Sequence, residues 1–297
     1  GNGNGNEIEN GTILKGTITS DVTLAAGNTY KLSGEYIVEE GGTLHIEEGV
    51  KIIAVYDDIA DYILVKQGGK INAVGTPDKP IVMTSEKEEP GAWGGIHICG
   101  RAHTNAEGGK GSSEIGGAVY GGNDDADNSG TLQYIRLEYT GFAFDEEHEA
   151  NGISFYSVGN GTIVDHCQAY KGSDDGFEFF GGSVNVSNLV AVSCSDDSFD
   201  WTEGWNGKGT NLVAYQEDKS TLGYDCDCLM ECDNNGSNNA ATPVAHPVLK
   251  NLILVGNGGS KQGIRLRAGT EVEIDNAKVC GKGQPLTVET ALTENAL

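Results

Sequence analysis

The sequence reads SDDGFEF at residues 173–179 and SDDSFDW at residues 195–201. The second copy follows the first by 22 residues and keeps the chemical class of every position: hydroxyl, two carboxylates, small residue, aromatic, carboxylate, aromatic. A repeat of about 20–45 residues is typical of a solenoid, in which each repeat packs only against its neighbours. Aromatic and acidic residues also alternate, as in a β-strand with one buried face. We therefore expect Phe177 to stack on Phe199 inside the protein, and Glu178 on Asp200 outside.

Other segments repeat along the chain with similar spacing. NLVA occurs at residues 188–191 and 211–214, and NLIL at residues 251–254. The Asn that begins each copy predicts a ladder of stacked side-chain amides at one corner of the solenoid. A second strand recurs as a triplet whose middle residue points outward. The expected outward column contains Ser154, Glu178, Asp200, Glu231 and Arg265.

The remaining sequence is consistent with an all-β solenoid. Short apolar runs alternate with Gly-rich turns over residues 12–84, and no helical period is sustained there. We predict one β-solenoid domain over residues 12–297, preceded by a flexible N-terminal tether over residues 1–11. A polar, Gly-rich segment at residues 101–130 predicts a long loop excursion from the solenoid, and residues near 234–247 predict an insertion.

The composition restricts the possible partners. The formal net charge is −25 and the isoelectric point about 4.4, which excludes nucleic acid because phosphate binding needs clustered Lys and Arg. Such acidity suits an extracellular protein and favours hard cations as ligands. Three of the seven cysteines cluster, at Cys226, Cys228 and Cys232. Without an obvious fourth ligand for zinc, buried thiols or one local disulfide are the favoured interpretation.

Several longer motifs carry a resemblance to known proteins. They include the tripeptide Gly-Thr-Pro at residues 75–77, and the sequences WGGI at 93–96, YIRLEY at 134–139 and DDGFE at 174–178. With these motifs the chain resembles the right-handed parallel β-helix proteins of the pectin-lyase-like superfamily. More narrowly, it resembles secreted or surface lipoproteins of Gram-negative bacteria. The resemblance implies a single-stranded right-handed parallel β-helix and an exported protein, either secreted or a lipoprotein of the outer-membrane surface. A lipid anchor upstream of Gly1 would be its membrane attachment. The resemblance implies no reaction.

The repeated acidic pairs are candidate metal ligands. Asp174, Asp175, Asp196 and Asp197 are expected on adjacent coils, where several carboxylates can share one Ca²⁺ ion with its six to eight oxygen ligands. In the alternative interpretation, each Asp accepts main-chain N–H groups at its own turn. Both interpretations can hold, because one oxygen can cap a turn while the other binds a cation.

The same aspartates are candidate catalytic residues, together with Arg265. Polygalacturonases share the β-helix and place catalytic aspartates on adjacent coils, which suggests a glycoside hydrolase as one alternative. The Gly-His-Gly motif of those enzymes is absent after the second acidic pair. A Ca²⁺-assisted uronate lyase is the other enzymatic alternative, with Arg265 or Arg267 as the base. Either arginine is better explained as a cation that neutralises Glu231 or holds an anionic sugar.

No complete catalytic set is visible, so a binding function is preferred. Trp205, Tyr215 and Tyr224 lie in a Gly-rich segment after the acidic motifs. One interpretation makes them an exposed aromatic platform for sugars, and the alternative is that they cover the end of the hydrophobic column. We predict an exported, non-catalytic module that binds a polysaccharide, a surface glycan or a surface partner, with acidic turns stabilised by Ca²⁺. The predicted binding residues are Glu178, Asp200, Trp205, Glu231, Arg265 and Arg267.

Overall fold

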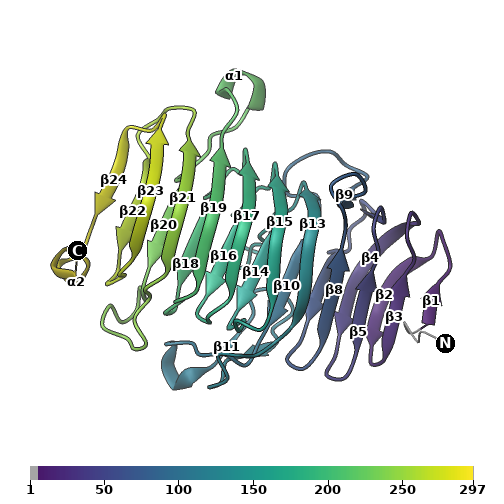
Figure 1. The fold of residues 1–297 in the computed structure, drawn as a ribbon. Helices are drawn as coiled ribbons and strands as arrows, with labels where there is room; N and C mark the ends of the chain where they lie inside the picture. The colour runs from purple at the N-terminus through teal and green to yellow at the C-terminus, as the bar shows by residue number, and fades with distance from the viewer. Residues whose placement is uncertain (1–5, 297) are drawn as a thin grey trace.

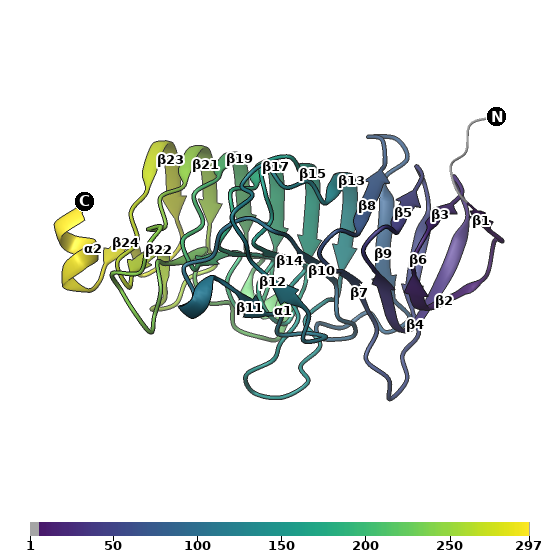
Figure 2. The ribbon, with the colours of Figure 1, turned by 90° about the horizontal axis from the view of Figure 1, so that it is seen from below.

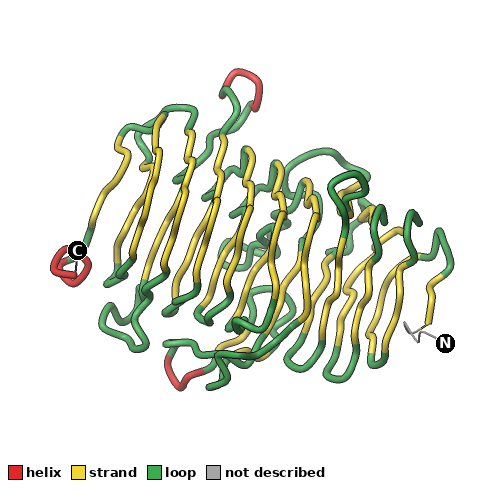
Figure 3. Tube along the Cα trace, in the orientation of Figure 1, coloured by secondary structure: helices red, strands yellow, loops and turns green. Residues whose placement is uncertain are grey.

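Three stacks of parallel strands run along the length of the molecule, which the computed structural model describes over residues 6–296 (Figure 1). Successive coils lie one above another from the N-terminal to the C-terminal end (Figure 2). The predicted all-β, single-stranded right-handed parallel β-helix is confirmed. The helical segments are short (Figure 3): η1 (Glu107–Gly109), α1 (Lys219–Leu222) and α2 (Ala291–Ala296). Within residues 6–296, no helix has the length and apolar character needed to cross a bilayer.

The first stack contains the strands of the repeated acidic motif. Its members are β2 (Ile13–Ile18), β4 (Thr29–Val38), β7 (Tyr62–Val65), β10 (Ile96–Cys99), β14 (Ile153–Tyr156), β16 (Phe177–Phe180), β18 (Phe199–Thr202), β20 (Met230–Asp233), β22 (Gln262–Arg267) and β24 (Gln284–Val288). The second stack begins with short strands, which are β1 (Asn6–Ile8), β3 (Asp21–Leu24), β5 (Thr43–Ile46) and β8 (Lys70–Val74).

The third stack contains the first halves of β2 and β4 and two short strands, β6 (Lys51–Ala54) and β9 (Ile81–Ser85). From residue 130 onward, long strands pass from the second stack into the third. They are β13 (Gly130–Glu138), β15 (Ile163–Tyr170), β17 (Asn185–Val192), β19 (Lys208–Tyr215), β21 (Val248–Val255) and β23 (Glu273–Cys280). In this part of the chain, each coil therefore contains one strand of the first stack and one long strand that forms both of the other two faces.

The predicted register of the acidic motif is confirmed. Phe177 pairs with Phe199 and Glu178 with Asp200 on strands β16 and β18. The rings of Phe177 and Phe199 are stacked with their centroids 5.6 Å apart, and both side chains are buried. The outward column continues through Glu231 to Arg265, as expected from the triplets. Apolar side chains fill the interior along the axis, which gives each coil its core against its neighbours.

The predicted asparagine ladder is also present, at the bend between the second and third stacks. Nδ2 of Asn211 donates to Oδ1 of Asn188 at 3.0 Å, and Nδ2 of Asn251 donates to Oδ1 of Asn211 at 3.1 Å. Asn276, which sequence inspection missed, adds a further rung. All four residues have positive φ values between 54° and 64°, a conformation that Asn tolerates better than most residues.

The excursion from residue 101 to 130 is folded against the β-helix. Its strands β11 (Gly111–Ser112) and β12 (Val119–Tyr120) pair antiparallel, and the segment covers the outer face of the first stack. A second hydrophobic cluster forms there, in which Tyr120 packs on Tyr156 with ring centroids 4.9 Å apart. This cover fixes one wall of the site described below.

Two further segments leave the coils near the C-terminal half. The predicted insertion at residues 234–247 lies between β20 and β21 and is joined to the 101–130 excursion, because Nδ2 of Asn105 donates to Oδ1 of Asn234 at 2.8 Å. Residues 216–229, which carry α1, form an excursion that the sequence did not predict. The expectation of a flexible tether is wrong for Asn6–Ile8, which form β1 and pair with β3. Residues 1–5 of that tether lie outside the described residues.

Candidate functional site

The two acidic pairs lie over one another at the turns that lead from the third stack into the first. The main-chain N–H of Asp197 donates to Oδ1 of Asp175 at 3.0 Å, and the N–H of Cys228 donates to Oδ1 of Asp197 at 3.0 Å. Asn151 has the same role one coil earlier, since its Oδ1 accepts the N–H of Asp175 at 3.2 Å. The second carboxylate of each pair therefore caps the following coil and not its own turn, because adjacent coils are within reach of a short side chain.

A cleft of about 200 Å³ opens at these turns. Its lining residues within the described chain are all acidic, and we call it the acidic cleft. They are Glu114, Glu146, Glu147, Glu149, Asp174, Asp175, Glu178, Asp196, Asp197, Asp200 and Glu231. The 101–130 excursion contributes Glu114, and the connection between β13 and β14 contributes Glu146, Glu147 and Glu149. The predicted metal ligands thus share one cleft with Glu178, Asp200 and Glu231 of the predicted outward column.

The spacing of the carboxylates fits a shared hard cation. One oxygen each from Asp174, Asp175 and Asp196 lie within 4.8 Å of one another, and the same holds for Asp175, Asp197 and Asp200. Two ligands on opposite sides of Ca²⁺ are separated by about 4.6–5.2 Å, twice the Ca–O distance. The donor set is made of carboxylate oxygens, which Ca²⁺ prefers. The residues present therefore fit a calcium ion.

The raised pKa values of the cleft carboxyl groups also favour a bound cation. Burial, followed by the charge of Glu178, raises the pKa of Asp174 to about 11. Burial and the charge of Glu114 raise the pKa of Glu178 to about 8. Burial and neighbouring carboxylates also raise the pKa of Asp175, Asp197 and Asp200 well above the usual range. Some carboxyl groups of the acidic cleft therefore keep their protons unless a cation neutralises the charge of the cleft.

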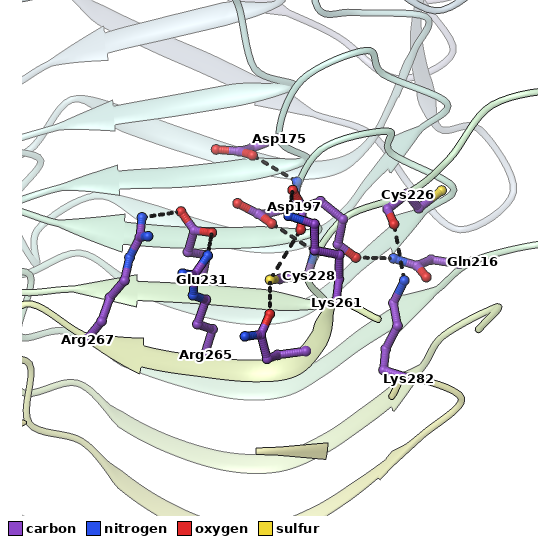
Figure 4. A network of polar contacts seen from close by, with 12 residues as sticks. Asp175, Asp197, Gln216, Cys226, Cys228, Glu231, Lys261, Arg265, Arg267 and Lys282 are labelled. Carbon is purple, nitrogen blue, oxygen red and sulfur yellow. Dashed lines mark hydrogen bonds and ion pairs between the residues drawn. The ribbon is translucent and has the colours of Figure 1, made fainter. Parts of the chain in front are cut away.

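Two arginines contact Glu231, one of the residues that line the cleft (Figure 4). Nη2 of Arg267 donates to Oε1 of Glu231 at 2.6 Å, and its Nε donates to Oδ1 of Asp233 at 2.7 Å. Nη1 of Arg265 lies 3.5 Å from Oε2 of Glu231, and its Nε donates to Glu289 at 2.6 Å. The hydrogen bond with Glu289 raises the pKa of Arg265. Both guanidinium groups therefore act as neutralising cations in this arrangement, and a role for Arg265 as a base is disfavoured.

The sequence of the chain matches a known family. The family model of the pectate-lyase-like beta helix domain matches residues 16–297. The chain belongs to this family. The assignment supports a carbohydrate-related β-helix protein. No curated protein and no solved structure matches the chain.

The predicted aromatic platform does not form on this pectate-lyase-like β-helix. Trp205 is 1% exposed and stacks on Phe179 inside the core, with ring centroids 4.0 Å apart. The prediction that Trp205 is an exposed binding residue is therefore wrong. Tyr224 is half-buried and its hydroxyl donates to the main-chain oxygen of Ser193 at 2.6 Å. Tyr215 is 46% exposed on β19 and is not among the residues that line the acidic cleft.

The clustered cysteines of this pectate-lyase-like chain are buried thiols. All seven cysteines of the chain are free. Burial raises the pKa of Cys228, and its Sγ donates to Oδ1 of Asp227 at 3.4 Å. One ligand atom each from Asp197, Asp227 and Cys228 lie within 4.8 Å of one another. This group has three ligand residues, and a structural zinc site has four. These three thiols are thus buried, and none of them is among the residues that line the acidic cleft.

The excursions contribute site residues that sequence reasoning missed. Glu114 and Glu149 line the acidic cleft, and burial raises the pKa of Glu114 to about 7. Neither residue belongs to the 22-residue repeat, which is why the repeat did not reveal them. The dense acidic run at residues 145–149, DEEHE, was a signal that could have drawn attention to this loop.

Proposed function

We propose that the protein binds a polysaccharide through a Ca²⁺ ion held in the acidic cleft, without cleaving it. The observation that carries the proposal is a cleft lined by eleven carboxyl groups, several of them buried, with oxygen atoms at the spacing of calcium ligands. Asp174, Asp175, Asp196 and Asp197 would hold the ion. Bound calcium would attract hydroxyl or carboxylate oxygens of a sugar, which can complete its coordination shell of six to eight oxygens.

The remaining cleft residues have distinct roles in this proposal. Glu178, Asp200 and Glu231 form an outward row along the first stack, which offers hydrogen-bond acceptors to sugar hydroxyl groups. Arg265 and Arg267 limit the negative charge at the end of that row. We also propose that the protein is exported, secreted or attached to the cell surface, because an acidic surface and a calcium site suit the calcium-rich extracellular space.

The enzymatic alternatives remain predictions with a direct test. A hydrolase or a lyase would use the same aspartates. The candidate base of the lyase is Arg265 or Arg267, although the ion pairs of both arginines disfavour that role. The expected result for the binding module is retention of glycans without products. Release of reducing ends, or of an unsaturated product that absorbs in the ultraviolet, would establish an enzyme instead.

The test uses the full chain on a panel of neutral and uronate-containing polysaccharides, with calcium or with a chelator. Asp175→Asn and Asp197→Asn are the informative variants, because Asn151 shows that an Asn can cap the following coil at this position. Asp58→Asn, on an exposed turn, is the matched control. We expect calcium-dependent binding by the wild type and the control, and weaker binding by both cleft variants. Binding that is unchanged by chelation and by both variants would reject the proposal.

A further inference from the structure

A second pocket, of about 290 Å³, lies beside the acidic cleft. We call it the lysine pocket, and its lining includes Ser195, Lys219, Asp225, Asp227, Ser260 and Lys261. The two sites adjoin, because Ser195 precedes Asp196 of the cleft in the chain, and the N–H of Asp227 donates to the main-chain oxygen of Asp196 at 3.1 Å. The 216–229 excursion forms one wall of the pocket.

Two ammonium groups line this pocket and a third lies behind its wall, in a chain with only 19 Lys and Arg against 44 Asp and Glu. Lys219 comes from α1, Lys261 from the turn before β22, and Lys282 from the turn before β24. Nζ of Lys282 donates to the main-chain oxygens of Cys226 and Gly258, both at 3.2 Å, which fixes its charge behind the pocket wall (Figure 4).

The acidic side chains of the pocket do not neutralise this charge fully. Lys219 lies 2.7 Å from Asp225, whose side chain is 86% exposed, and such exposed pairs contribute little. Lys261 lies 3.7 Å from Asp227. Lys282 forms no ion pair with any residue of the described part, and burial lowers its pKa. The two lysines and two aspartates of the lining thus balance in charge, and Lys282 behind the wall adds a positive charge that has no ion-pair partner among the described residues.

The type of cation indicates the type of anion. Arginine binds planar carboxylates with two parallel hydrogen bonds, whereas the ammonium of lysine is a compact charge that suits oxyanions approached from several directions. The lysine pocket combines such ammonium groups with the hydroxyl of Ser260. We propose that the lysine pocket is a binding site for a tetrahedral oxyanion, the sulfate ester or phosphate group of a ligand.

The neighbouring cleft sets a condition on this site. Its carboxylates repel an anion at the lysine pocket until a cation neutralises them. If calcium occupies the acidic cleft, calcium therefore tightens oxyanion binding, and by linkage the oxyanion tightens calcium binding by the same factor. The oxyanion site itself does not rest on the proposed function, so the two can fail separately.

The test is calorimetric titration of the full chain at constant ionic strength, with inorganic sulfate in chelator and in calcium, and with inorganic phosphate in chelator. Lys219→Ala and Lys261→Ala are expected to weaken binding about tenfold each, as for a hydrogen bond to a charged group. Both side chains are partly exposed, so both variants are expected to fold, and thermal unfolding checks this. Lys250→Ala, on the exposed side of β21, is the matched control and is expected to bind like the wild type.

Sugars then identify the source of the oxyanion. A sulfated sugar, a phosphorylated sugar and their neutral parent are titrated under the same conditions, and preference for either charged sugar over the parent supports the site. Absence of saturable binding of both inorganic anions under all of these conditions, with calcium included for sulfate, or an equal loss in Lys250→Ala, would overturn it. Sulfate binding that is saturable but insensitive to calcium would leave the oxyanion site intact and argue against calcium in the acidic cleft.

Discussion

Replacing Glu178 by Gln changes the charge of the acidic cleft with little change of shape. Burial, followed by the charge of Glu114, raises the pKa of Glu178 from 4.5 to about 8. Because the folded pKa lies above the unfolded one, this carboxylate lowers stability as the pH rises above about 4.5, until the effect is complete near pH 8. At pH 7 the difference is about 2.5 pH units, which corresponds to about 3 kcal/mol at 1.36 kcal/mol per unit.

We therefore expect E178Q to be about 3 kcal/mol more stable than the wild type at pH 7 in the presence of a chelator. The Gln side chain keeps an oxygen for Nδ2 of Asn151, which donates to Oε1 of Glu178 at 2.9 Å. At pH 5 the advantage falls below about 1 kcal/mol, because pH 5 lies only about 0.5 unit above the unfolded pKa of 4.5. Calcium is expected to reduce the advantage at pH 7, since the ion offsets the repulsion.

The assay is denaturant unfolding at pH 5 and pH 7, with chelator and with calcium. Glu88→Gln, at an exposed position outside the cleft, is the control and is expected to change stability by less than about 0.5 kcal/mol. A loss of stability in E178Q at pH 7 in chelator would refute the reasoning. A gain of the same size at pH 5 and pH 7 would refute it as well.

Three other substitutions test separate parts of the account. Trp205→Ala removes a buried ring that stacks on Phe179, so thermal unfolding should show a loss of about 3–5 kcal/mol, while the folded fraction still binds glycan. Burial lowers the pKa of His97 to about 4. Its contribution of about 3 kcal/mol is lost as the pH falls from about 6.5 to 4, and His97→Gln should flatten that part of the stability profile. Asn211→Ala removes two ladder bonds and should cost about 1–2 kcal/mol in chemical unfolding.

The fold was predictable because its determinants are local and repeat. The 22-residue spacing and the alternation around Phe177 and Phe199 specify both the stacking and the side of each residue, and the structure has that register. The Asn at the start of the three repeated segments similarly predicted the corner ladder. The four aspartates of the two acidic pairs could be placed in one cleft by the same argument.

Residues that lie in turns and excursions escaped prediction. Trp205 follows β18 after Glu203 and Gly204, both at positive φ, so the chain turns there and the side chain enters the core. Alternation along a strand does not extend through such a turn. Glu114, Lys219 and Lys261 belong to no repeat. The folding of two excursions onto the coils brings Glu114 and Lys219 to the two sites, and Lys261 comes from the turn before β22.

The central claim is that stacked carboxylates of adjacent coils hold one calcium ion. The most direct measurement is a crystal structure of the full chain grown with calcium, with anomalous diffraction to identify the ion. The account predicts an anomalous peak about 2.3–2.6 Å from oxygens of Asp174, Asp175 and Asp196, or of Asp175, Asp197 and Asp200. A well-ordered acidic cleft without an anomalous peak at saturating calcium would contradict it.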